Sequence, residues 1–135
     1  FMVGDESSAE FAVVFVHGAG GSKKLGFNDW TFGGNFNRLK NLSVNNRGSY
    51  YSPSFTFNEV GLSGAHAMIE HIHQQNANTK IIFACGSMGA YICWRLAEDS
   101  TSAKNVSGFI FLGSASANVM LDQLPAVKRR RPIVY

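Results

Sequence analysis

Charged residues are scarce in this chain of 135 residues: they make up 16% of it, against 45% apolar residues. So many apolar and so few charged residues argue against a disordered segment and indicate a folded domain with its own core. The sequence also lacks any apolar run of roughly 18 residues, the length that a membrane-spanning helix needs. We therefore expect one globular domain over residues 1–135, with no membrane among its partners.

Cysteine is also scarce: the chain contains two, Cys85 and Cys93. Both stand in apolar segments, which does not suggest a disulfide framework, so a cytoplasmic location is the default expectation. The first ten residues include Asp5 and Glu6 and no apolar leader, so we expect no signal peptide. We expect neither a metal nor a cofactor.

The net charge is only +3, and the basic residues concentrate in one run at residues 128–131. Such a run is most often the solvated end of a helix. The alternative, a patch for nucleic acid or another anionic partner, lacks the interleaved aromatic side chains that strand-binding surfaces use. We therefore expect no nucleic-acid partner.

Continuous apolar runs recur along the chain and predict its strands. They are Phe11–Val16, Lys80–Cys85 and Ser107–Leu112, with Pro132–Tyr135 opening a fourth and Leu42–Asn46 a weaker candidate. Runs that are apolar throughout, rather than alternating, are typical of strands buried on both faces of a parallel sheet.

Helical patterns fall between these runs. Thr56 and Glu59 have the spacing of a capping box, and apolar residues recur after them at helical spacing. The expected helices are one after Thr56, one over Met88–Ala97, a short one over Asn118–Lys128 and a broken one over Asp29–Leu39, interrupted at Gly33-Gly34. Strands that alternate with helices in this way predict a three-layer α/β/α sandwich around a mostly parallel sheet.

The segment Cys85-Gly86-Ser87-Met88-Gly89 joins the second apolar run to a helix that is apolar almost all round. A serine in so short a strand-to-helix turn takes a strained backbone conformation that lifts its hydroxyl above the sheet edge, and it needs small neighbours. We expect Gly86 to allow the tight approach of the chain to itself at this turn, and Gly89 to let the helix begin close to the strand. The alternative for Ser87 is an ordinary helix N-cap.

This segment resembles the nucleophile elbow of the α/β-hydrolase family, small-x-Ser-x-Gly, with Cys85 in the place of the usual first glycine. The stretch Val14–Gly21 is similar to the strand and His-Gly loop of that family, and Asn46–Pro53 to the Arg-Gly-x-x-x-Ser stretch after its next strand. The resemblance implies an α/β-hydrolase core in which Ser87 is the nucleophile. It also implies supporting roles for His17 and Gly18, and an oxyanion hole formed by the backbone N–H groups of Met88 and Ala19.

The resemblance further implies hydrolysis of a small-molecule carboxylic ester, thioester or amide through an acyl-Ser87 intermediate. The family places the acid after the strand that begins here at Pro132 and the histidine one strand later, so both are expected outside this chain, and the core is incomplete at its C-terminal end. His17 and Asp122 are weaker candidates for these two roles. We expect the remaining histidines, His66, His71 and His73, to be solvated or to pack against neighbours.

Four further interpretations remain to be stated. A phosphate loop over Gly18–Lys23 fails because the Gly-Lys-Ser/Thr pattern is missing. A catalytically incomplete binding module on a hydrolase scaffold stays open, as does a homo-oligomer formed through an exposed sheet edge. A set of aromatic residues could line an apolar pocket or simply pack in the core: Trp30, Phe32, Phe36, Tyr50 and Tyr51.

Overall fold

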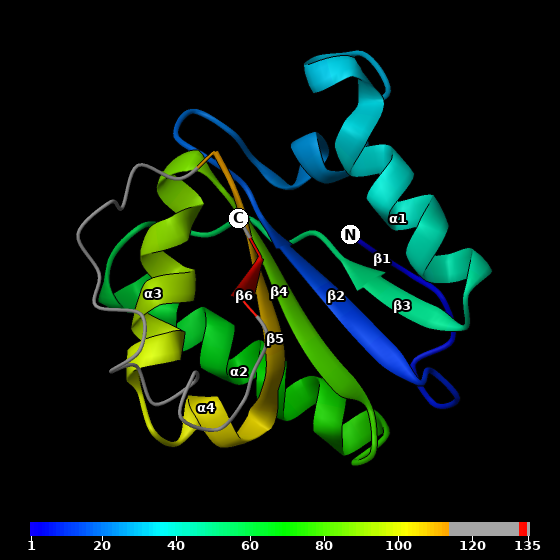
Figure 1. The fold of residues 1–135 in the computed structure, drawn as a ribbon, viewed down its shortest axis with the longest axis vertical. Helices are drawn as coiled ribbons and strands as arrows, with labels where there is room; N and C mark the ends of the chain where they lie inside the picture. The colour runs from blue at the N-terminus through cyan, green and yellow to red at the C-terminus, as the bar shows by residue number, and fades with distance from the viewer. Residues whose placement is uncertain (114–132, 135) are drawn as a thin grey trace.

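The computed structural model describes residues 1–113 and 133–134, and a six-stranded sheet runs through that part of the chain (Figure 1). In spatial order the strands are β1 (Met2–Val3), β3 (Gly48–Tyr51), β2 (Phe11–Val16), β4 (Lys80–Gly86), β5 (Val106–Leu112) and β6 (Ile133–Val134). Every neighbouring pair is parallel except β1 with β3. The predicted, mostly parallel sheet is therefore confirmed.

The central strands β2, β4 and β5 lie side by side in register. Val16 of β2 is opposite Cys85 of β4, which in turn is opposite Phe111 of β5. Because parallel strands end at the same edge of a sheet, this register brings the segments that follow β2 and β4 together. The carboxyl edge of the sheet is where open α/β folds bind their ligands.

Helices cover both faces of the sheet, so the three-layer prediction is also confirmed (Figure 1). One face carries α1 (Asn35–Asn45), preceded by the short 3-10 turns η1 (Lys23–Phe27) and η2 (Thr31–Gly34). The opposite face carries α2 (Glu59–Gln75), α3 (Ala90–Glu98) and α4 (Ser102–Asn105), with the 3-10 turn η3 (Ser87–Gly89) leading into α3.

Strand β2 supplies side chains to two separate cores. Val14 and Val16 are fully buried in the cluster formed with α2 and α3, whereas Val13 and Phe15 belong to the cluster on the α1 side. This alternation explains the unbroken apolar sequence of the strand, since both of its faces are buried. Burying each such side chain stabilises the fold by about 1.5–3 kcal/mol.

The weak strand candidate Leu42–Asn46 is wrong, because Leu42 and the residues up to Asn45 belong to α1. The hydroxyl of Ser43 donates to the Leu39 carbonyl and the Asn46 side chain donates to the Leu42 carbonyl, so polar side chains hold this last turn. The strand follows instead over Gly48–Tyr51, after Arg47 at a φ of 64°. The stretch 46–53 is thus a turn and a strand rather than a loop after a strand.

The capping box at Thr56 and Glu59 is also wrong. The N-cap of α2 is Asn58, whose side-chain oxygen accepts hydrogen bonds from the Val60 and Gly61 amides. Asparagine caps a helix as well as threonine does, and here it stands nearer the helix. Glu59 is left free to reach α3, where it pairs with Arg95 at 2.7 Å.

Some expectations lie outside the described residues, namely the helix over 118–128, the basic run 128–131 and Asp122. No helix in the described part of the chain is both long and apolar enough to cross a membrane. Within the same residues, no group of three histidine, cysteine or acidic side chains could hold a metal ion.

The N-terminal segment is fastened to β3 and α2 through the carboxylate of Glu6. The buried Tyr51 donates its hydroxyl to Glu6 Oε1 at 2.7 Å, and His71 Nε2 lies 2.8 Å from the same oxygen. The Tyr51 hydroxyl, and after it His71, holds the pKa of Glu6 below its ordinary value. Burial raises the pKa of Tyr51, so that residue stays a proton donor.

We predict that Glu6→Gln flattens the acid side of the stability profile. Because the pKa of Glu6 is lower in the folded chain, its contribution is present above the ordinary glutamate range and is lost as the pH falls through the folded value. Urea unfolding between pH 3 and pH 7 should therefore show the largest loss in the variant at neutral pH, shrinking toward pH 3. Glu70→Gln, which alters an exposed glutamate of α2 next to His71, is the control. Parallel profiles for Glu6→Gln and wild type would contradict the prediction.

Candidate active site

Ser87 follows β4 directly and begins η3, at the carboxyl edge of the sheet. Its φ is +48°, a left-handed conformation that non-glycine residues rarely adopt. For an L-residue this conformation costs roughly 1–2 kcal/mol and persists only where the surroundings fix it. Ser87 is also exposed, so the turn holds a strained serine at the surface rather than in the core, as the sequence predicts.

The small residues around Ser87 differ in what they allow. A Cβ added at Gly89 would lie 2.6 Å from the His17 carbonyl oxygen and 2.7 Å from that of Val16, so no side chain fits there. A Cβ added at Gly86 would lie no nearer than 3.7 Å to any of these neighbours, which is ordinary contact. The expectation that Gly86 allows the tight approach is therefore wrong, because the close contact is at Gly89.

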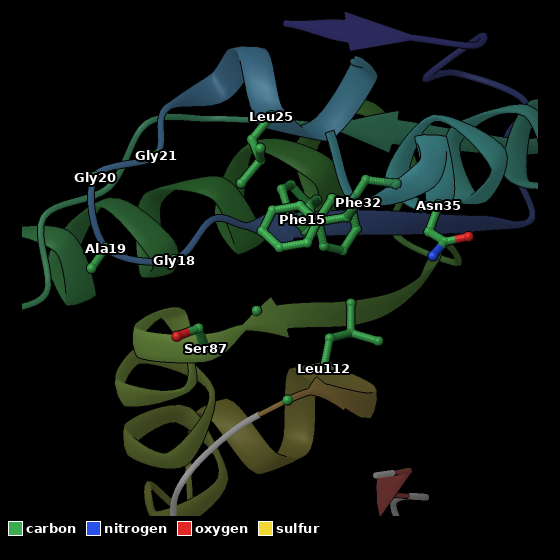
Figure 2. Close-up of a pocket in the computed structure, with 13 residues that line it drawn as sticks. Phe15, Gly18, Ala19, Gly20, Gly21, Leu25, Phe32, Asn35, Ser87 and Leu112 are labelled. Carbon is green, nitrogen blue, oxygen red and sulfur yellow. The ribbon is translucent and has the colours of Figure 1, made fainter. Parts of the chain in front are cut away.

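A cavity of about 620 Å³ opens at this edge (Figure 2). Ser87 and the Gly18–Gly21 loop line one end of it, and in Figure 2 Asn35 lies toward the other. The remaining walls are glycine or apolar side chains, from Phe15, Leu25, Phe32, Phe36, Gly86, Leu112 and Gly113. Ser87 and Asn35 thus supply the polar side chains among the described lining residues, and none of these residues is charged.

Of the five aromatic residues considered for a pocket, the structure places Phe32 and Phe36 in this cavity. Phe36 packs against Phe15 with ring centroids 4.4 Å apart. Trp30 is 93% exposed and lies outside the cavity wall. Tyr50 is buried, with its hydroxyl donating to the Gly26 carbonyl, and Tyr51 is bonded to Glu6, so both serve the core.

His17 holds the loop behind the cavity and uses both ring nitrogens to do so. Its Nε2 accepts a hydrogen bond from the Phe55 amide at 3.1 Å, so that nitrogen carries no proton. Its Nδ1 lies 2.8 Å from the Gly18 carbonyl oxygen, to which it donates. His17 is 4% exposed, and because both ring nitrogens are engaged in hydrogen bonds, neither is left to take a proton from Ser87.

All four histidines of the chain are described, and none lines the cavity. His71 faces Glu6, and His66 Nδ1 lies 3.4 Å from the Ser102 hydroxyl oxygen. That hydroxyl donates to Asp99 at 2.7 Å, as does the Ser102 amide, which lowers the pKa of Asp99. This group of Ser102, Asp99 and His66 fixes the start of α4, and no histidine lies beside Ser87 among the described residues that line the cavity.

Met88 follows Ser87 in η3, and Ala19 lies on the Gly18–Gly21 loop at the same end of the cavity (Figure 2). A Cβ added to Gly18 would lie 3.1 Å from Ser87 Cβ, so this loop packs directly against the serine. That the Ala19 and Met88 amides converge on one oxyanion stays a prediction.

Cys85 and Cys93 form a disulfide, which corrects the expectation of no disulfide framework. Their Cα atoms are 6.2 Å apart, and both side chains are fully buried between β4 and α3. Sequence reasoning took the apolar surroundings of the cysteines as evidence against pairing. The sequence feature that could have predicted the pairing is the position of the two cysteines on either side of a strand-to-helix turn, because such a turn folds the chain back on itself.

Comparison with known proteins agrees with this architecture. The chain matches the protein family described as alpha/beta hydrolase fold over residues 12–132. A Staphylococcus aureus subsp. aureus Mu50 protein of unknown function superposes with a TM-score of 0.59 at 18% identity, over 86% of this chain and 41% of that one. The mature Bacillus licheniformis lipase BlEst2 superposes with a TM-score of 0.58 at 19% identity, over 84% and 46%.

The chain therefore spans less than half the length of these solved structures. At such low identities the likeness is one of fold. No curated protein sequence matches the chain.

We predict that Gly89→Ala destabilises the chain much more than Gly86→Ala does. The added methyl group at position 89 meets two backbone carbonyls that cannot rotate away, and overpacking of this kind costs about 1–3 kcal/mol or more. At position 86, in extended backbone with room for a methyl group, we expect less than about 1 kcal/mol. The free energy of unfolding in urea measures both, and equal losses would show that Gly89 is not the tight contact.

Proposed function

This chain belongs to the alpha/beta hydrolase fold family, and we propose that within that family it provides the nucleophile and oxyanion loop of a serine hydrolase. The observation that carries the proposal is Ser87 itself. It stands at a left-handed φ at the carboxyl end of β4, exposed in a cavity that it shares with the Gly18–Gly21 loop. An ordinary N-cap serine needs neither the strained backbone nor the cavity.

In the proposed reaction, a histidine from outside this chain takes the proton of the Ser87 hydroxyl, and the oxygen attacks the carbonyl carbon of the substrate. The Met88 and Ala19 amides donate to the oxyanion that forms, and removing one such donor in comparable sites costs about 3–4 kcal/mol. The leaving group departs with the proton. Water then releases the acid from acyl-Ser87.

A carboxylic ester, thioester or amide is the substrate class that this chemistry serves. The uncharged, mostly apolar wall of the cavity supports an apolar acyl group, because a charged group there would lose its hydration without gaining a partner. One of the structural neighbours is a lipase, which fits an ester but establishes nothing for this chain.

The competing proposal is a binding module that retains the scaffold without the chemistry. The observation that favours it is the lack of a base: no histidine of the chain reaches the cavity. Self-association through a sheet edge also stays a proposal, and the described edges are β1 and β6.

The compartment is part of the proposal as well. A cytoplasmic location was expected from cysteines that do not pair, but disulfides persist mainly in oxidising compartments. The Cys85–Cys93 bond therefore weighs against the cytoplasm.

We predict that the chain alone reacts slowly with a fluorophosphonate probe and that a version extended past Tyr135 is labelled faster at Ser87. Loss of a triad member typically removes several orders of magnitude in rate while some catalysis by the oxyanion hole remains. Intact mass and peptide mapping measure the adduct, and Ser87→Ala is the control.

The outcomes separate the two proposals. Fast, stoichiometric labelling of the short chain would mean that a base is present here or in a second copy. An absence of labelling in both forms would favour the binding module.

We predict that Phe36→Ala shifts the extended enzyme toward longer acyl chains. The Phe36 ring reaches to 4.0 Å from a Cβ position at Gly86, so it limits the cavity next to the nucleophile. One methylene in an apolar pocket changes kcat/KM by roughly 10–200-fold, and we expect a change near the lower figure for each added methylene that the enlarged cavity accommodates. Nitrophenyl esters of increasing length measure it. Leu42→Ala, on an exposed position of the same helix, should leave the preference unchanged.

A further inference from the structure

A covalent bond bridges the turn that carries Ser87. Cys85 is the next-to-last residue of β4 and Cys93 lies on α3, so their disulfide closes a loop that contains Ser87 and Gly89. Both cysteines are fully buried, within the cluster that packs β4 against α2 and α3. In the motif that this segment resembles, the position of Cys85 is a glycine, which could not form such a bridge.

The two ends of the bridge are held in different ways. Cys85 is paired on both sides, opposite Val16 of β2 and Phe111 of β5, so β4 cannot move without breaking the sheet. Helix α3 is held by side-chain packing, including Trp94 stacked on Phe111 with centroids 4.1 Å apart. Any movement between the two would therefore be a movement of α3, which begins just after η3.

Such a movement of α3 would change the backbone conformation of Ser87. A left-handed φ at Ser87 persists only while both flanking segments are fixed, because relaxation would return it to a more common conformation. Gly89 limits approach toward β2, since its contacts with the Val16 and His17 carbonyls are already close. Those contacts do not prevent α3 from moving away, whereas the disulfide does.

We propose that the Cys85–Cys93 disulfide positions Ser87 by tying α3 to β4 across the nucleophile turn. Reduction adds two electrons and two protons, breaks the S–S bond and leaves two thiols. Thiol sulfurs at non-bonded contact stand farther apart than bonded ones, and the extra space must come from α3. The reactive geometry thus belongs to the oxidised chain. This inference rests on the proposed hydrolase function.

The test compares wild type with Cys85→Ala, Cys93→Ala and the double variant. The first measurement needs no activity: amide hydrogen exchange at residues 86–90, referenced to β5, in the chain of residues 1–135. The second is fluorophosphonate labelling at Ser87 in the extended protein, separated into a rate constant and a probe affinity. Wild type refolded in tris(2-carboxyethyl)phosphine gives the reduced state without any substitution, should a variant fail to fold.

We expect exchange at residues 86–90 to rise about 10-fold and exchange in β5 to stay unchanged. The labelling rate constant should fall about 10–100-fold at nearly constant probe affinity, because small displacements of reacting groups cost that much. Each single variant should equal the double variant, since either one breaks the same bond.

Three results would overturn the proposal: two free thiols in the unreduced chain, unchanged exchange at residues 86–90, or a lowered melting temperature with an unchanged labelling rate constant. If wild type is labelled at Ser87 neither as the chain of residues 1–135 nor as the extended protein, the hydrolase function fails. Exchange then still decides whether the disulfide holds the turn.

Discussion

The contact of Gly89 with the end of β2 is the constraint on which the rest of the site depends. Backbone carbonyls of Val16 and His17 come so near the Gly89 α-carbon that a methyl group would overlap with them. Because this approach is between backbones, it fixes the loop after β2 relative to the turn after β4 without relying on side-chain conformation. The Gly18–Gly21 loop is thereby set against Ser87, and the cavity that both line exists only because the two segments meet there.

Two hydrogen bonds of His17 also fix the position of that loop. His17 joins the Gly18 carbonyl to the Phe55 amide, which links the loop after β2 to the segment leading into α2. The two hydrogen bonds demand opposite roles of the two ring nitrogens, one donating and one accepting, and only the neutral ring provides both. The position of the loop therefore depends on one buried side chain, although that side chain takes no part in the proposed proton transfer.

How far the sequence predicts this structure depends on how local the determining physics is. Strands β2, β4 and β5 could be predicted because burial on both faces leaves a continuous apolar run, and the strained serine because the strand-to-helix turn is short. The C-terminal turn of α1 could not, since Val44 favours a strand by propensity while hydrogen bonds from Ser43 and Asn46 close a helical turn. Asn58 is the cap although both residues suit the role, and the Thr56 hydroxyl donates to the same Asn58 side-chain oxygen that caps the helix.

The disulfide and the glycine contacts were hidden from sequence reasoning for a common reason: each depends on the distance between segments that only the folded sheet brings together. Cys85 and Cys93 resemble buried apolar residues until β4 and α3 are laid against each other, and Gly86 and Gly89 look equivalent until β2 is placed beside one of them.

The proposed nucleophile and its missing base differ in which parts of the fold must supply them. Backbone placement of a nucleophile is a property of neighbouring segments, so β2, β4 and α3 provide it together. A general base must reach the same point from another part of the fold, and the four histidines on β2, α2 and their flanks point to other partners or away from the cavity. Under the proposed function, the described segments hold Ser87 in a left-handed conformation at the cavity, and the base is a group outside the described residues.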